Sequence, residues 1–210
     1  MIIRKESFEK KEGKIMKNIQ ITTTEGKDKL FVSTPYKHSF VSKIKKIGGI
    51  WDYSEKKWGV PKNNSLILSK LLKECFGNDG TPCETVDVEI TLEKKLTAEC
   101  EPVFLFGTVV AAARGRDSGA KVPENVAFLR GEVASGGSAR YWQTIVKEGA
   151  QFIIYAVPRQ AIENRLDWED DYGSFKILKT KSDTNKLEEE REFLLGRIAE
   201  IDSLLANKAS

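Results

Sequence analysis

The segment from residue 40 to residue 61, FVSKIKKIGGIWDYSEKKWGVP, constrains the fold more than any other part of the chain. Apolar side chains recur in it at helical spacing and predict an amphipathic helix over about 39–47: Phe40, Val41, Ile44 and Ile47. The pair Gly48-Gly49 ends this helix, because glycine readily takes the left-handed conformation of a helix C-terminus. Two short strands, over 50–52 and 57–60, are expected to follow around a tight turn. The segment therefore predicts a compact helix and hairpin.

Cations and aromatic rings alternate along the same segment. Trp51 and Trp58 supply rings on which bases can stack, each contact contributing about 1–3 kcal/mol. The lysines around them are placed to contact phosphates: Lys43, Lys45, Lys46, Lys56, Lys57 and Lys62. We expect one tryptophan to be buried in the core and the other to be partly exposed, and the sequence does not say which. A simpler interpretation of the lysines, that they are only solvated, stays open.

These residues, from the helix through Gly48-Gly49 to the two tryptophans, resemble the HARP domain, a small module that annealing helicases carry beside their motor. They are also similar to a small domain fused to bacterial plasmid-transfer and primase-like proteins. The resemblance covers about residues 30–77 and implies DNA binding, at branched sites or junctions between single and double strands. The sequence contains no Gly-x4-Gly-Lys-Ser/Thr phosphate loop, so the resemblance implies binding without a helicase motor.

Charge is distributed unevenly over the 210 residues. Residues 1–80 carry 17 Lys and Arg against 9 Asp and Glu, a net charge of +8, whereas the remainder carries 17 against 22, a net charge of −5. The basic front is therefore the candidate for binding a polyanion. No apolar run is long enough to cross a membrane, so no membrane partner is expected.

Cysteine and histidine usage gives no sign of a metal or a disulfide framework. Cys75, Cys83 and Cys100 form no CxxC pair, and the single His38 cannot complete a zinc set with them. We therefore expect no cofactor, and a reducing cytoplasm as the compartment. Cys75 lies on the apolar face of a predicted helix and is expected in the core.

Local composition divides the chain into four parts and predicts the α+β class. Residues 1–16 lack apolar periodicity, and the codons of Lys11-Glu12-Gly13 can resemble a bacterial ribosome-binding site, so we expect a disordered or non-native extension before a native start at Met16. Residues 17–80 form a basic α+β module, with a strand over 29–33 and a second helix over 65–76. The stretch 78–82, NDGTP, is a linker signal.

Residues 84–181 are predicted to be rich in strands, because apolar and polar residues alternate from Val86 onward. Further strands are expected over 103–111, 126–129, 141–146, 152–157 and 175–179, with a hairpin turn at 147–150 and a short helix over 160–166. This content indicates a small antiparallel barrel or sandwich. Two glycine-rich loops, 114–119 and 135–140, carry Arg114, Arg116 and Arg140 and could cradle a phosphate, although a pair of flexible hairpin loops is the simpler interpretation.

Residues 182–210 are predicted to form a helix with a heptad pattern. Its candidate oligomerisation positions are apolar: Leu187, Leu194, Ile198, Ile201 and Leu205. Arg191 also falls at a core position and weakens the pattern. About three heptads are marginal for an isolated coiled coil, so the helix either pairs with a second copy in a homo-oligomer or docks on its own chain.

We find no recognisable catalytic set and interpret the protein as non-enzymatic. His38 has no second histidine for a relay, and the acidic run 166–173, LDWEDDYG, is interpreted as a solvated loop rather than a divalent-ion site. We expect a cytoplasmic protein, bacterial or phage-encoded, that binds nucleic acid, DNA rather than RNA, through phosphate contacts and stacking. The alternatives are a phage-type inhibitor that binds a host defence protein complex, and a nucleotide- or nucleic-acid-processing enzyme that uses the glycine-rich loops.

Overall fold

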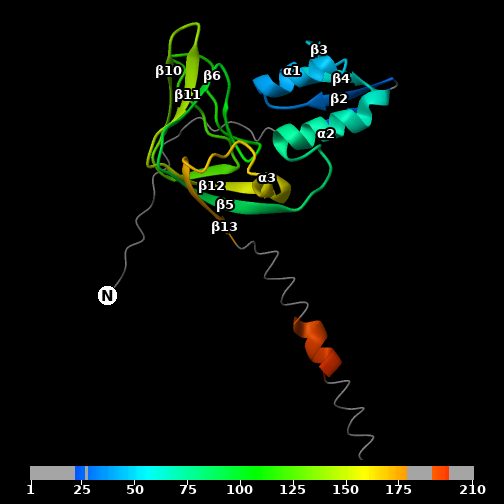
Figure 1. Ribbon diagram of the computed structural model, residues 1–210, viewed down its shortest axis with the longest axis vertical. Coiled ribbons are helices and arrows are strands. Elements are labelled where there is room, and N and C mark those ends of the chain that lie inside the picture. Colours follow the sequence, from blue (N-terminus) through cyan, green and yellow to red (C-terminus); the bar gives the residue numbers. More distant parts are fainter. Residues whose placement is uncertain (1–21, 27, 179–190, 199–210) are drawn as a thin grey trace, which may run out of the picture.

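The computed structural model describes residues 22–26, 28–178 and 191–198 (Figure 1). The described chain combines helices with antiparallel sheets, so the α+β class is confirmed. The extension expected over 1–16, and with it the start at Met16, lies outside the described residues.

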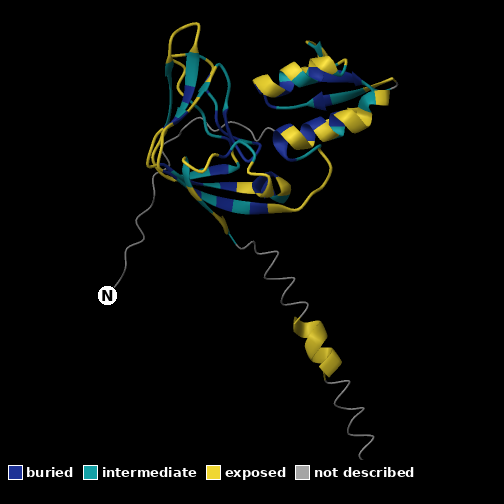
Figure 2. Ribbon diagram, viewed as in Figure 1, coloured by how far each residue is buried: buried dark blue, intermediate teal, exposed yellow. Residues whose placement is uncertain are grey.

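The front module is a four-stranded sheet with two helices. Its elements follow the chain as β1 (Thr22–Glu25), β2 (Lys29–Ser33), α1 (His38–Lys46), β3 (Ile50–Asp52), β4 (Lys57–Pro61), a 3-10 turn (Lys62–Asn64) and α2 (Ser65–Phe76). The strand order is β1-β2-β4-β3, with every pair antiparallel. Val32 and Val60 are fully buried with Phe40 of α1 and Leu72 of α2, so the two helices cover one face of the sheet (Figure 2). The edge strand β1 was not predicted.

The β-rich part contains two larger sheets and a hairpin. Its elements are β5 (Thr85–Leu92), β6 (Leu96–Glu99), β7 (Val103–Leu105), β8 (Thr108–Ala111), β9 (Val126–Arg130), β10 (Val133–Gly137), β11 (Trp142–Val146), β12 (Gln151–Pro158), α3 (Arg159–Glu163) and β13 (Gly173–Leu178). One sheet has the order β13-β5-β12-β9, another β10-β11-β6, and β7 pairs with β8. The sheet of β6, β10 and β11 rises beside the front module as an arm (Figure 1).

Three predictions for this part were wrong. Residues 103–111 form the hairpin β7–β8 rather than one strand, because Phe106 and Gly107 turn the chain at φ of 50° and 69°. Residues 147–150 are not a β-hairpin turn, because β11 and β12 belong to different sheets. The two strands only contribute buried side chains to the same core. Residues 135–137, expected as a loop, lie in β10 and pair with β11. Alternation along the chain identifies a strand but does not specify which sheet it joins.

The front module and the β-rich part share a core despite the linker. Phe104 of β7 and Val109 of β8 are buried among the side chains of α1, α2 and β4. At this contact Gly107 has no room for a side chain, because a Cβ there would lie 2.4 Å from the carbonyl oxygen of Phe76. The linker signal at 78–82 therefore marks a change of local structure and not a separation of two independent cores.

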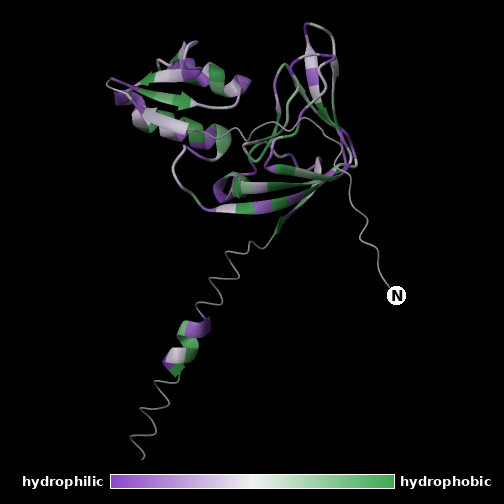
Figure 3. Ribbon diagram, turned by 180° about the vertical axis from the view of Figure 1, so that it is seen from behind, coloured by the Kyte–Doolittle hydropathy of each residue, from purple (hydrophilic) through white to green (hydrophobic). Residues whose placement is uncertain are grey.

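Residues 191–198 are helical and exposed, and the segment contains both hydrophilic and hydrophobic residues (Figure 3). Leu194 and Ile198 are 51% and 53% exposed. Arg191 is exposed as well, whereas the other candidate oligomerisation positions Leu187, Ile201 and Leu205 lie outside the described residues. Within the described part of the chain, no helix is both long enough and apolar enough to span a membrane.

Candidate nucleic-acid interface

The two tryptophans lie side by side but differ in exposure. Trp51 and Trp58 are register partners on β3 and β4, and their rings meet edge to face with centroids 5.2 Å apart. Trp58 is 7% exposed because β4 is a central strand covered by α1, whereas Trp51 is half-buried on the edge strand β3. Trp58 therefore packs against Trp51 from the side of the core, and Trp51 is the more accessible of the two rings.

Trp51 forms one wall of a groove of about 610 Å³ between α1 and β3. We call this the aromatic groove; its lining residues are Thr34, Pro35, Tyr36, Val41, Lys45, Gly49, Ile50, Trp51, Tyr53 and Trp58. Tyr36 and Tyr53 are 52% and 86% exposed, so two phenol rings stand free beside the indole. Rings presented in this way can stack on bases of any sequence, because every base offers a π face.

The turn that carries Tyr53 is held by its neighbour Asp52. The carboxylate of Asp52 accepts hydrogen bonds from the Ser54 hydroxyl at 2.6 Å and from the backbone N–H groups of Ser54 and Glu55 at 2.9 and 3.1 Å. These bonds, led by that of the Ser54 hydroxyl, lower the pKa of Asp52 below its ordinary value. At neutral pH the ionised carboxylate therefore fixes the hairpin turn and with it the position of Tyr53.

The six lysines predicted to contact phosphates fall into two sets of three. Lys43 pairs with Glu74 at 2.5 Å, Lys62 pairs with Glu25 at 2.7 Å, and Lys57 lies 3.9 Å from Glu55. The remaining three have no carboxylate within 4.0 Å among the described residues: Lys45, Lys46 and Lys56. Of these, Lys45 lines the aromatic groove and supplies its positive charge.

The two glycine-rich segments lie next to each other and form hydrogen bonds with one another. The hydroxyl of Ser135 donates to the carbonyl of Arg116 at 2.7 Å and accepts from the N–H of Gly119 at 3.0 Å. The guanidinium of Arg116 pairs with Asp117 at 2.8 Å. Because the N–H of Gly119 and the guanidinium of Arg116 already have partners, they are less available to bind a phosphate.

Arg140 and Arg114 stay exposed outside that arrangement. The guanidinium of Arg140 lies over the ring of Tyr141 at 5.4 Å, in the turn that follows β10. Neither arginine lines the aromatic groove, so the structure does not bring the predicted front and middle contact residues into one pocket.

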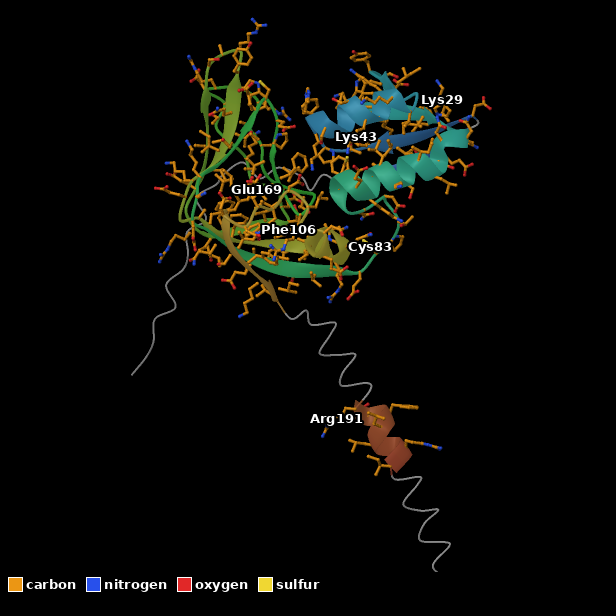
Figure 4. The ribbon with its side chains drawn as sticks, viewed as in Figure 1. Lys29, Lys43, Cys83, Phe106, Glu169 and Arg191 are labelled. Carbon is orange, nitrogen blue, oxygen red and sulfur yellow. The ribbon has the colours of Figure 1, made fainter. Side chains whose placement is uncertain are left out.

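The acidic run is bound to the rest of the protein by ion pairs and by its tryptophan. Asp167 pairs with Lys37 of the front module, Asp170 with Arg165, and Asp171 with Lys94. Trp168 is 8% exposed and stacks on Phe106 inside the core. Figure 4 labels Phe106 and Glu169, both in the β-rich part. No group of three metal-ligating side chains is found in the described ranges.

Sequence reasoning did not select Tyr36 and Tyr53, which line the aromatic groove, although both are aromatic residues at the boundary of a predicted element. It also missed Lys37, because a lysine before a helix gives no signal of burial. No family model matches the chain, and neither the curated proteins nor the solved structures contain a significant match.

Proposed function

We propose that the protein binds nucleic acid without catalysis, and that the aromatic groove receives an unpaired or branched DNA strand. The front module acts as a HARP-like helix, hairpin and helix unit. The tail assembles copies through its heptad positions, of which Leu194 and Ile198 are exposed in the described helix. The protein acts in the bacterial cytoplasm and is encoded by the bacterium or by a phage.

The observation that carries this proposal is one free cation among three accessible rings. Lys45 has no carboxylate partner in the described chain and stands in the same groove as Tyr36, Trp51 and Tyr53. Ring stacking binds bases while the ammonium group binds a phosphate, and neither contact depends on sequence. A duplex keeps its bases stacked on each other, so a strand with unpaired bases is the better ligand.

The test is fluorescence anisotropy with single-stranded, forked and duplex DNA across a salt series. Tyr53→Ala should weaken binding of the single strand about 5- to 150-fold, since a stacked base contributes about 1–3 kcal/mol and 1.4 kcal/mol is tenfold. Tyr155→Ala on β12, 40% exposed in the wild-type protein, is the matched control and should leave affinity unchanged. Absence of binding at low salt would overturn the proposal.

A charge control uses two exposed lysines. Lys45→Ala should reduce the slope of log affinity against log salt by about 0.7, the value for one phosphate contact on a single strand. Lys70→Ala removes an exposed lysine of α2 that does not line the groove, and should leave the slope unchanged. Equal slopes for both variants would contradict a phosphate contact at Lys45.

A protein-directed function is the second candidate, because α2 begins with two exposed apolar residues. Leu66 is 84% exposed and Ile67 52% exposed, a surface suited to a partner protein such as a host defence complex. The absorbance ratio at 260 and 280 nm of the purified protein separates the two candidates. A high ratio indicates copurified nucleic acid and favours the first.

A further inference from the structure

The front sheet has a second face, turned away from α1 and α2. Four residues form one row across it in the strand order, because each is the register partner of the next: Thr24, Phe31, Gly59 and Ile50. Thr24 is exposed and Ile50 is 65% exposed, and Phe31 belongs to neither buried core. Among the residues that the structure describes, no helix covers this row.

The ring of Phe31 lies close to two glycines, which leave room for it. Its Cε2 atom lies 2.8 Å from the place where a Cβ of Gly26 would stand, and its Cε1 atom lies 3.5 Å from the corresponding place at Gly59. Two edges of the ring therefore lie over positions without a side chain, and Phe31 remains partly exposed. A ring held in this way is a rigid surface for stacking, since it loses little freedom when a base covers it.

Two lysines stand on either side of this ring. Lys29 is two residues before Phe31 and Lys57 two residues before Gly59, so both point to the same face as the ring. Lys29 pairs with Pro61 in the register, so Lys57 lies four residues further along, or about 14 Å at 3.4 Å per residue. Lys29 is exposed, on the side of the front module away from the β-rich part (Figure 4).

The negative charge on this face is already engaged. Asp52 lies two residues after Ile50, but its carboxylate accepts three hydrogen bonds from the hairpin turn. Lys29 has no carboxylate within 4.0 Å in the described chain, although its charge contributes to lowering the pKa of Asp52. Lys57 is only loosely paired, with a Glu55 oxygen at 3.9 Å. A flat aromatic ring between two cations fits a base between two phosphates better than it fits an apolar protein surface.

We infer that this open face is a second stacking site for the same single strand, which reaches it by passing around the edge strand β3. Ile50 connects the two sites, because it lines the aromatic groove and also ends the row that contains Phe31. Trp51, the next residue, points to the groove side. The inference rests on the proposed function, and adds that the ligand is long enough to contact both sides of the sheet.

The test compares oligothymidylates of about 4 and about 16 nucleotides, which span the range of site sizes for single-strand binding folds. Phe31→Leu keeps an apolar side chain beside the glycines but removes the ring, and Lys29→Ala removes a cation that forms no ion pair within 4.0 Å in the described chain. Both variants should weaken binding of the long oligomer about fivefold or more and leave the short one unchanged. Lys70→Ala is the control, and thermal unfolding verifies that each variant is folded.

The outcomes separate this inference from the function on which it rests. If Tyr53→Ala weakens the long oligomer but Phe31→Leu and Lys29→Ala do not, the second site is refuted while the groove stands, and the open face is left to a protein partner. If the wild-type protein binds neither oligomer, both the proposed function and this inference are refuted. Should Phe31→Leu fail to fold, Lys29→Ala alone decides the outcome.

Discussion

Replacing Lys37 tests whether one buried ion pair joins the front module to the β-rich part. The Nζ atom of Lys37 donates to both carboxylate oxygens of Asp167, at 2.6 and 2.8 Å, and to the carbonyl oxygen of Cys75 at 2.9 Å. It also lies 4.8 Å from the centre of the Phe104 ring. Lys37→Met removes all of these contacts while keeping a side chain of similar length.

The burial of the pair sets the expected magnitude. The side chains of Lys37 and Asp167 are 11% and 22% exposed. Lys37→Met therefore leaves a largely buried Asp167 carboxylate whose remaining donor in the described chain is the N–H of Gly107 at 3.2 Å. Removing one partner of such a pair costs about 3–5 kcal/mol of unfolding free energy. Lys43→Met is the matched control, because its pair with Glu74 is 43% and 57% exposed and contributes at most about 1 kcal/mol.

Urea denaturation followed by tryptophan fluorescence measures these free energies. Asp167→Asn and the double variant with Lys37→Met complete a cycle, and the double variant should lose less than the sum of the two single losses, because the second change removes a charge that the first left unpaired. Equal costs for Lys37→Met and Lys43→Met, or additive losses in the cycle, would refute the reasoning.

Three further predictions concern residues that the structure places in supporting roles. Trp58→Ala should lower the unfolding free energy by about 3–5 kcal/mol, measured by urea denaturation, because it empties a buried site beneath Trp51. Gly107→Ala should lower the melting temperature, since its Cβ would lie 2.4 Å from a Phe76 backbone oxygen at a positive φ; an unchanged value would contradict this close approach. Burial raises the pKa of Asp79, but hydrogen bonds from Ser69, Thr81 and Lys73 outweigh it and hold that pKa well below its ordinary value. Ionised Asp79 therefore stabilises the fold fully at pH values above its unfolded pKa of about 4, and this stabilisation is lost as the pH falls toward its folded pKa. The difference in unfolding free energy between wild type and Asp79→Asn, measured by urea denaturation, should shrink as the pH is lowered. A difference that does not change with pH would contradict this.

Local sequence was sufficient for the elements whose pattern repeats within a few residues. The second helix was predicted over 65–76 and is observed as Ser65–Phe76, and the strand over 29–33 is observed as Lys29–Ser33. Cys75 is 3% exposed, as its position on the apolar helix face predicts. These features follow from helical or alternating spacing, and from a glycine at position 77 that ends α2 at a φ of 71°.

Strand partners and the composition of each core could not be predicted in the same way. Residues 147–150 resemble a hairpin turn in isolation, but the chain passes there from one sheet to another. The hairpin β7–β8 supplies Phe104 and Val109 to a core made mostly by the front module. Both results depend on which surfaces meet in three dimensions, and short-range alternation carries no information about that.

The sequence by itself determined that a helix over about 39–47 and a hairpin over 50–60 would carry paired tryptophans and a positive charge. Only the tertiary structure decided that Trp58 is buried and Trp51 accessible, because a central strand is covered on a face that an edge strand leaves partly open. Only the tertiary structure also joined Lys37 to Asp167, 130 residues away. The local sequence specifies which side chains a segment carries. Burial and side-chain contacts depend on packing between segments far apart in the chain, and this packing decides which groups a ligand can reach.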